Sequence, residues 1–340
     1  MKILFLICHP AHVHQFKYLI KDLQKSGNKV KVLVLKKDNN TYLLKQNKIK
    51  YTQISNNTGN NMLEKIIITI STTYKINKIC NKFKPDFLID RGSPMMAFNG
   101  FINKTKHIVY DDNDFQTFSL NIMKLFSWKI ITPTSFKKDL GKKQIRINTL
   151  KELSYLHPKY FKQNPRIIKK YNIDINKSYA LVRFVAWKAS HDTGIKHMSL
   201  EEKYKLITEL NKYTKVYIST EAKLPKKFNK YLLKIKPEDI HHIMYYASVF
   251  IGEGATMAAE SILLGIPTVY FNPIDNATTK EFQQKTKLFI KDNNNLSKNV
   301  IRSTLKFLKT SNIKNNQEFF RKKISNQFID INTTIKQLLK

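Results

Sequence analysis

The stretch FIGEGATMAAESILLGIPTVYF, residues 250–271, places two carboxylates around a glycine turn in the least polar part of the chain. Gly254 precedes an apolar segment with helical spacing, and the free N–H groups at the start of such a helix attract phosphate. Glu260 lies four residues after Thr256, on the same helix face, where it can accept hydrogen bonds from sugar hydroxyls. This spacing points to the diphosphate and ribose of a nucleotide. The competing interpretation is a plain turn at Gly254 with Glu260 facing water.

Two other sets of titratable residues follow strand-like runs in the first half of the chain. His12 comes after ILFLI, and its ordinary pKa of about 6.5 suits proton transfer near neutral pH. Asp111 and Asp112 follow HIVY, and Asp112 is a second candidate base. His12 is the preferred one, although each of these residues could instead cap the segment after it. The histidines at 9, 12 and 14 lack the spacing of zinc ligands, so no metal is expected.

The strand-like run YALVRFVAW contains Arg183 and leads into a loop with Trp187 and Lys188. Arg183 and Lys188, together with the helix start at residues 255–257, could stabilise the charge on a departing diphosphate without a metal. Trp187 could line a pocket for a sugar or base, or it could cover a domain junction. No cofactor other than a nucleotide-linked co-substrate is implied.

The elements that must position these residues follow from periodicity and from glycine and proline breaks. Residues 248–251 are predicted as a buried strand, 256–264 as a helix that stops at Gly265, and 267–271 as a second strand. Ligands of parallel α/β sheets bind at the carboxyl ends of strands, which is where the glycine turn falls.

The same alternation of strand and helix runs through the chain twice, which predicts an α/β fold of two doubly wound, Rossmann-like domains facing across a cleft. The expected boundaries are 1–155 for an acceptor-side domain, 156–176 for a linker and 177–315 for a nucleotide-sugar-binding domain. Residues 316–340 are expected to form a helix packing across the junction.

Composition narrows the class of partner. The 340 residues include 60 Lys and Arg against 25 Asp and Glu, a formal net charge of +35. The lysines are spread over the whole chain and accompany no nucleic-acid motif, so nucleic acid is not an expected partner. Attraction to an anionic membrane surface stays open. The N-terminus does not resemble a secretory signal, and Cys8 and Cys80 are typical of buried thiols in a reducing compartment. A cytoplasmic protein is expected, with peripheral contact at the inner face of the membrane as an alternative.

Four segments together resemble the family called domain of unknown function 354. They are HPAHVHQFKYLIKDLQKSGNKV, IVYDDNDFQT, LVRFVAWKASHDTG and YYASVFIGEGATMAAESILLGIPTVYFNP. That family is similar to the glycosyltransferase B (GT-B) superfamily, which includes UDP-N-acetylglucosamine 2-epimerase and the lipid II-forming N-acetylglucosaminyltransferase. The resemblance implies that Gly254, Ala255 and Thr256 bind a nucleotide diphosphate and that Glu260 holds the ribose. It also implies that His12 corresponds to a histidine of the N-terminal loop.

Two departures from the superfamily bear on the reaction. HPAHVH replaces a loop with several glycines, and Ser93 in RGSP stands where the epimerases have an aspartate. The second departure disfavours epimerisation, which needs more than one well-placed acid or base. The favoured function is transfer of a sugar from a nucleotide-sugar donor, UDP-linked by resemblance, to a hydroxyl acceptor such as a lipid-linked glycan in surface polysaccharide or glycolipid synthesis. A nucleotide-sugar 2-epimerase and a non-catalytic nucleotide-sugar-binding protein are the alternatives.

Overall fold

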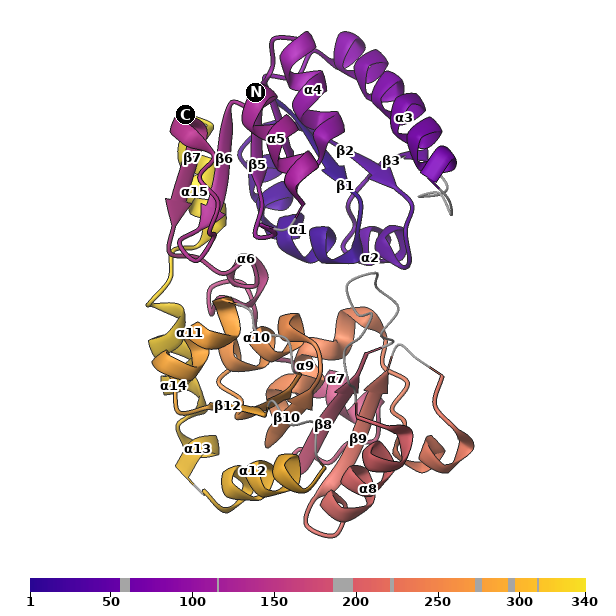
Figure 1. The fold of residues 1–340 in the computed structure, drawn as a ribbon, viewed down its shortest axis with the longest axis vertical. Coiled ribbons are helices and arrows are strands. Elements are labelled where there is room, and N and C mark those ends of the chain that lie inside the picture. Colours follow the sequence, from indigo (N-terminus) through magenta and orange to yellow (C-terminus); the bar gives the residue numbers. More distant parts are fainter. Residues whose placement is uncertain are drawn as a thin grey trace. The chain divides into compact units, whose positions relative to one another are not determined.

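The computed structural model describes residues 1–55, 62–114, 116–185, 198–220, 223–272, 277–292, 297–310 and 312–340. The chain divides into two compact units (Figure 1). Unit 1 comprises residues 1–155 and 328–340, and unit 2 comprises residues 156–327. The residues expected to form a linker, 156–176, lie inside unit 2.

Unit 1 is built, within the described residues, on a seven-stranded sheet in which every recorded pairing is parallel. The strands, in their order across the sheet, are β3 (Thr52–Ser55), β2 (Lys29–Leu35), β1 (Lys2–Ile7), β4 (Phe87–Asp90), β5 (Lys106–Tyr110), β6 (Lys129–Pro133) and β7 (Gln144–Ile147). The chain passes from β1 outward to β3 and then returns to β4 on the other side of β1. This reversal creates a switch point, beside which α/β sheets bind ligands.

Helices cover both faces of this sheet because alternate strand residues point to opposite sides. Ile3, Phe5 and Ile7 of β1 lie in one core cluster, while Leu4 and Leu6 lie in another. The helices and single turns of unit 1 are α1 (Pro10–Lys25), α2 (Asn40–Gln46), α3 (Met62–Phe83), α4 (Pro94–Ile102), α5 (Thr117–Phe126), η1 (Gly141–Lys143), α6 (Leu153–Leu156, whose last residue begins unit 2) and α15 (Ile331–Leu338).

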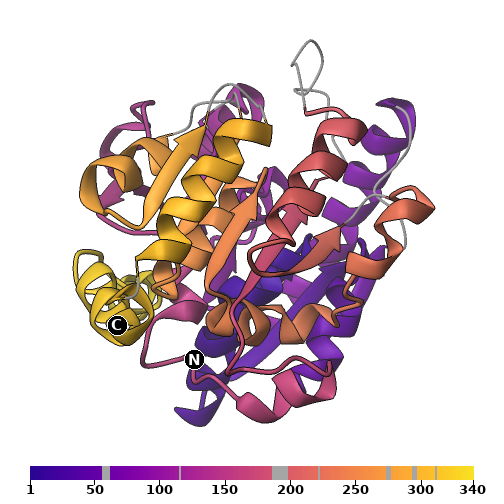
Figure 2. The same ribbon diagram turned by 90° about the horizontal axis from the view of Figure 1, so that it is seen from below.

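Unit 2 contains a five-stranded parallel sheet in the part of the chain that is described. Its order is β12 (Phe289–Asp292), β11 (Thr268–Phe271), β10 (Val249–Gly252), β8 (Tyr179–Phe184) and β9 (Lys215–Thr220). Its helices are α7 (Pro165–Lys170), α8 (Leu200–Leu210), η3 (Lys226–Tyr231), η4 (Pro237–Asp239), α9 (Ile240–Tyr246), α10 (Ala255–Leu263), α11 (Ala277–Lys285), α12 (Ser297–Lys309), α13 (Asn312–Asn315) and α14 (Gln317–Ser325). Helices α8 and α12 pack side by side on one face of the sheet (Figure 2).

The strand, turn, helix and strand predicted for residues 248–271 are confirmed as β10, α10 and β11. Gly265 ends α10 with a φ of +74°, and a Cβ on it would lie 2.5 Å from the Gln317 carbonyl oxygen. The expectation of a single helix over residues 316–340 was wrong, because this segment forms two helices. It is interrupted after Ser325, and Asp330 caps a new helix by accepting from the Asn332 N–H at 3.0 Å.

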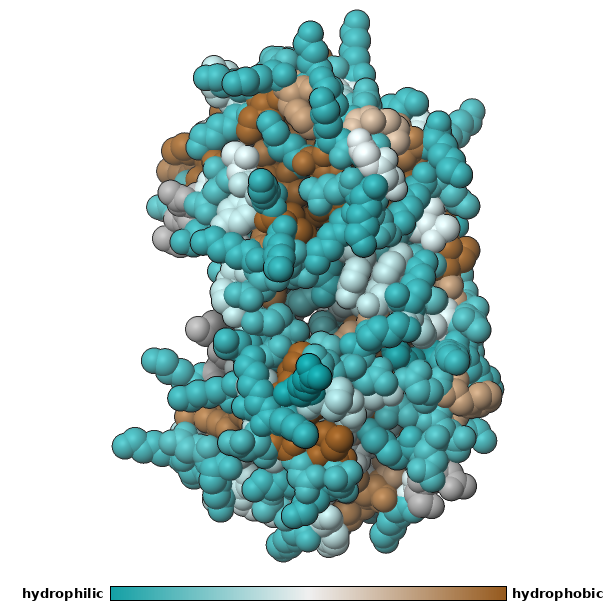
Figure 3. All heavy atoms as spheres, turned by 180° about the vertical axis from the view of Figure 1, so that it is seen from behind, coloured by the Kyte–Doolittle hydropathy of each residue, from teal (hydrophilic) through white to brown (hydrophobic). Residues whose placement is uncertain are grey.

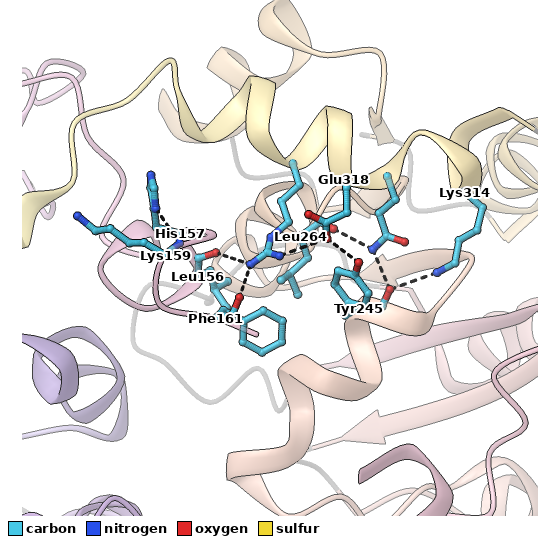
Figure 4. A network of polar contacts seen from close by, with 10 residues as sticks. Leu156, His157, Lys159, Phe161, Tyr245, Leu264, Lys314 and Glu318 are labelled. Atoms are coloured by element: carbon cyan, nitrogen blue, oxygen red, sulfur yellow. Dashed lines mark hydrogen bonds and ion pairs between the residues drawn. The ribbon is translucent and has the colours of Figure 1, made fainter. Parts of the chain in front are cut away.

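A buried arginine fastens α14 to the start of unit 2. The guanidinium of Arg321, which is 2% exposed, donates to the carbonyl oxygens of Leu156 at 3.3 Å and Phe161 at 2.7 Å. Glu318 lies 3.3 Å from the same guanidinium and accepts from the Tyr245 hydroxyl at 2.6 Å (Figure 4). The segment between α6 and α7 is therefore held at Leu156 and Phe161 by a side chain of α14.

Arg321→Met is expected to destabilise unit 2 by about 2–4 kcal/mol, because it leaves two buried carbonyl groups without their donor. The urea midpoint of unfolding measures this, with exposed Lys322→Met as the matched control. Equal midpoints for the two variants would show that water replaces the guanidinium at no cost.

Candidate active site

In unit 1, polar side chains gather where β1, β4 and β5 end. Arg91 follows β4 and lies 2.5 Å from Asp112, which follows β5. The other carboxylate oxygen of Asp112 lies 2.8 Å from the Lys151 ammonium, and Lys151 also contacts Glu152 at 2.9 Å. These four side chains form an ion-pair network, which we call the Asp112 network. Because the strands are parallel, their carboxyl ends bring residues far apart in sequence to one edge.

The pKa values of the two adjacent aspartates at this edge are shifted in opposite directions. Burial alone would raise the pKa of Asp112, but Lys151 and Arg91 outweigh burial and hold that pKa well below its usual range. Asp111 is 5% exposed, and burial raises its pKa to about 6, while the Asn113 N–H that donates to it at 2.9 Å acts in the opposite direction. Asp112 is therefore a fixed anion, whereas Asp111 can exchange a proton near neutral pH.

His12 lies in the first turn of α1, half-buried beside this network. Its Nδ1 accepts from the Cys8 N–H at 3.3 Å, and the cap of α1 comes from His9, which accepts from the Ala11 N–H at 3.1 Å. Burial, and then the charge of Arg91, hold the pKa of His12 well below 6.5, so the ring is neutral at pH 7. A neutral ring that accepts at Nδ1 carries its proton on Nε2 and can donate there.

Gly92 allows the loop after β4 to approach the loop after β5. Its φ is +68°, and a Cβ on it would lie 2.9 Å from Oδ2 of Asp111. Ser93, next in sequence, accepts from the Met96 N–H at 3.4 Å and so caps α4. The Ser93 hydroxyl thus serves the start of a helix.

Gly92→Ala is expected to lower the free energy of unfolding by about 1–3 kcal/mol and to displace Asp111. The backbone at residue 92 is left-handed, which disfavours alanine, and the new methyl group would meet the Asp111 carboxylate. Thermal unfolding measures the loss. Gly254→Ala is the control, since Gly254 has a φ of −97° and the nearest atom to its Cβ position lies at 3.4 Å. If the Gly92 variant has the same melting temperature as the wild type, the backbone of Gly92 does not lie as close to the Asp111 carboxylate as described.

In unit 2, the predicted residues Gly254, Ala255, Thr256 and Glu260 share one turn and one helix. Gly254 is the N-cap of α10, Thr256 is exposed, and the first turn contains no acidic residue. The first N–H groups of a helix have no partner within the helix, so this start can receive an anion. Glu260 is buried on the same helix, and its carboxylate lies 3.0 Å from Nε2 of His241 on α9.

Glu253 has a structural environment that differs from that of Glu260. Its carboxylate lies 2.7 Å from the Lys203 ammonium and accepts from the Val185 N–H at 2.9 Å, and the residue is 2% exposed. Its carbonyl oxygen accepts from Asn272 at 2.8 Å. Glu253 therefore joins the segments after β8, β10 and β11, whereas Glu260 belongs to the helix that opens at the glycine turn.

Arg183 lies opposite Gly252 in the register of β8 and β10, and it donates to the Ser219 hydroxyl at 2.7 Å. Trp187 and Lys188 lie outside the described residues.

Sequence reasoning missed Arg91, Lys151 and His241. Arg91 could have been found by the rule that selected Asp112, since it directly follows a buried strand. Lys151 and His241 lie in segments without a comparable signal.

The described residues contain neither a cluster of metal ligands nor a helix that could span a membrane. No group of three or more His, Cys, Asp or Glu side chains among them could hold a metal ion. In the same part of the chain, no helix is both long and apolar enough to cross a membrane.

Solved structures with the same architecture align with nearly the whole chain. UDP-GlcNAc 2-epimerase from Neisseria meningitidis, solved with UDP-GlcNAc, has 16% identity and a TM-score of 0.70, covering 100% of this chain and 99% of that chain. The epimerase of Methanocaldococcus jannaschii has 14% identity and a TM-score of 0.66, covering 94% and 99%. The spinosyn forosaminyltransferase SpnP has 10% identity and a TM-score of 0.67, covering 99% of each chain.

The class of protein follows from this architecture: two Rossmann-like units with parallel sheets, which is the GT-B fold. The predicted fold class is confirmed in this respect. The chain belongs to the family described as protein of unknown function (DUF354), whose model matches residues 1–330. No curated protein is significantly similar to it in sequence.

Proposed function

We propose that this protein is a metal-independent glycosyltransferase that moves a sugar from a nucleotide-sugar donor to a hydroxyl acceptor in surface polysaccharide or glycolipid synthesis. The observation that supports it most is the helix start at Gly254, with buried Glu260 on the same helix. The N–H groups of residues 255–257 receive the diphosphate, and Glu260 accepts from the ribose hydroxyls. The donor is UDP-linked, in line with the UDP-GlcNAc and UDP named for the structural neighbours.

Unit 1 supplies the acid–base groups of the proposed reaction. Asp111 accepts the proton of the acceptor hydroxyl, because its pKa of about 6 leaves it ionised yet basic at neutral pH. Asp112, expected from sequence as a base, is a weak proton acceptor in its network and instead fixes Arg91 and Lys151. His12 donates from Nε2 to a substrate oxygen. Arg183, Trp187 and Lys188 stay candidates for stabilising the departing diphosphate or lining the donor pocket.

A nucleotide-sugar 2-epimerase is the second candidate. It is favoured by the full-length similarity in fold to UDP-GlcNAc 2-epimerases and by the presence of two further carboxylates, Asp111 and Glu152, beside Asp112. Against it stands Ser93, whose hydroxyl caps α4 and supplies no carboxylate at that position.

Incubation of the purified protein with a panel of nucleotide sugars, with and without alkyl glycosides as hydroxyl acceptors, separates the candidates. Acceptor-dependent release of the nucleotide supports the transferase. Acceptor-free epimerisation, with solvent deuterium entering the sugar, supports the epimerase. Binding without any turnover would show a non-catalytic binding protein, and absence of binding would overturn all three.

A further inference from the structure

One face of unit 1 exposes apolar side chains that lie outside its core. Helices α3, α4 and α5 lie side by side, with α4 in contact with both others. Along α3, exposed apolar residues recur at helical spacing. Leu63, Ile66, Ile67, Ile70 and Tyr74 are 73%, 47%, 64%, 65% and 68% exposed. The opposite side of the same helix buries Ile76 and Cys80 in the core. Helix α3 is therefore apolar on two faces, and one of them is open.

The open apolar surface continues across α4 and α5. Phe101 is 60% exposed, Phe118 is 77% exposed and Leu125 is 66% exposed. Phe101 and Phe98 pack on the ring of Phe126, with ring centroids 4.9 and 5.8 Å apart. Figure 3 views unit 1 from the side opposite to that of Figure 1, and some brown surface lies among long teal side chains there too. We call these exposed residues of the three helices the α3–α5 face.

Lysines accompany the α3–α5 face, and acidic residues are nearly absent from it. Lys78 and Lys82 of α3 and Lys124 of α5 are exposed, while Glu64 is the one acidic residue in the sequences of the three helices. Where α3 and α4 end, the residues that line a groove of about 720 Å³ include three lysines, one aspartate and an isoleucine: Lys84, Lys104, Lys106, Asp86 and Ile102. The groove therefore carries a net positive charge and adjoins the ends of two of the helices that expose the apolar side chains.

We propose that the α3–α5 face docks on an anionic phospholipid bilayer, with its apolar side chains entering the interface and its lysines contacting lipid phosphates. Exposed aromatic and aliphatic residues beside lysines match the interfacial region of a bilayer, where cations gain from anionic lipids. A second copy is the poorer occupant, because an isologous contact would bring together two chains that each carry a formal net charge of +35. No helix in the described residues could span the bilayer, so the contact is peripheral.

This surface deepens the proposed function, because a transferase held at a membrane meets lipid-linked acceptors. The test uses the full chain without nucleotide or acceptor, so that its result is separate from that of the turnover assay. Co-sedimentation is measured with vesicles of phosphatidylcholine and phosphatidylglycerol, and with vesicles of phosphatidylcholine alone. We expect binding to the anionic vesicles that weakens as salt is added, and much weaker binding to the neutral ones.

The double variant Ile67→Ser with Ile70→Ser is expected to bind anionic vesicles about tenfold more weakly, because two interfacial side chains are lost. The matched control is Tyr213→Ser with Phe319→Ser, which changes two residues of unit 2 that are 59% and 61% exposed. Lys78→Gln with Lys82→Gln is expected to reduce the salt dependence.

Two outcomes overturn the proposal. The first is unchanged vesicle binding by the Ile67 and Ile70 variant. The second is a wild-type dimer in analytical ultracentrifugation that dissociates in that variant, since it would identify a second copy as the occupant. Because both side chains are largely exposed, the variant is expected to melt with the wild type, and turnover on a soluble alkyl glycoside should be unchanged.

Discussion

Glu260→Gln is expected to weaken UDP binding about ten- to a hundredfold, while the protein stays folded. The substitution keeps the size of the side chain and its place beside His241, but it removes the charge that strengthens hydrogen bonds from ribose hydroxyls. A hydrogen bond to a charged group contributes about 1.5–3 kcal/mol, which corresponds to this range of affinity. Isothermal titration calorimetry with UDP measures the effect, and equal dissociation constants would remove the ribose assignment.

A comparison of UDP with its 2′-deoxy analogue identifies the group that Glu260 contacts. The wild type is expected to discriminate against the analogue, and Glu260→Gln is expected to discriminate less, since the variant and the analogue remove parts of the same hydrogen bond. Glu253→Gln is the control on the same edge of the sheet. Because Glu253 is paired with Lys203, its loss should lower the melting temperature and leave the preference for ribose unchanged.

Asp111→Asn is expected to lower kcat by about a hundred- to ten-thousandfold while UDP affinity stays within about twofold, as loss of a general base does. Asparagine is nearly isosteric and can still accept from the Asn113 N–H, so the loop should keep its position. Turnover is measured with the donor and acceptor pair that the nucleotide-sugar panel identifies. A variant with wild-type kcat would exclude Asp111 as the base.

The pH profile gives an independent reading of the same residue. Asp111 must be ionised to accept a proton, and burial raises its pKa to about 6, so activity should rise as pH increases through 6 and level off above it. Asp112 is not expected to produce this rise, because Lys151 and Arg91 hold its pKa well below the usual range, and burial shifts the pKa of His12 downward from its ordinary value. If the rise persists unchanged in the residual activity of Asp111→Asn, another group is responsible.

The backbone architecture was largely predictable because apolar periodicity and glycine breaks are strong local signals. Strand β1 alternates its core residues between two faces, and Gly265 ends α10 as predicted. Three features were not predictable from those signals. The edge strand β12 is short and contains Lys291, the break between α14 and α15 has no glycine or proline to mark it, and the segment 156–161 is fixed by the distant Arg321.

The sequence predicts on which strand, helix or loop each site residue lies, but not which residues of other segments contact it. The sequence placed Asp112 at the end of a strand, but its acidity depends on Arg91 and Lys151, which come from two other segments. The same holds for Asp111, since burial under the loop of Gly92 sets its pKa. Pairings of this kind are set by tertiary contacts, and one sequence contains no local signal for them.

The return of the chain to unit 1 has a consequence for biosynthesis. Ile331, Ile335 and Leu339 belong to the same core cluster as Phe5 and Phe16. During translation, all of unit 2 is synthesised before these residues. Unit 2 can therefore fold on the ribosome, whereas unit 1 completes its core only after α15 has been synthesised. A stop codon at position 328 would therefore leave unit 2 complete and remove part of the core of unit 1.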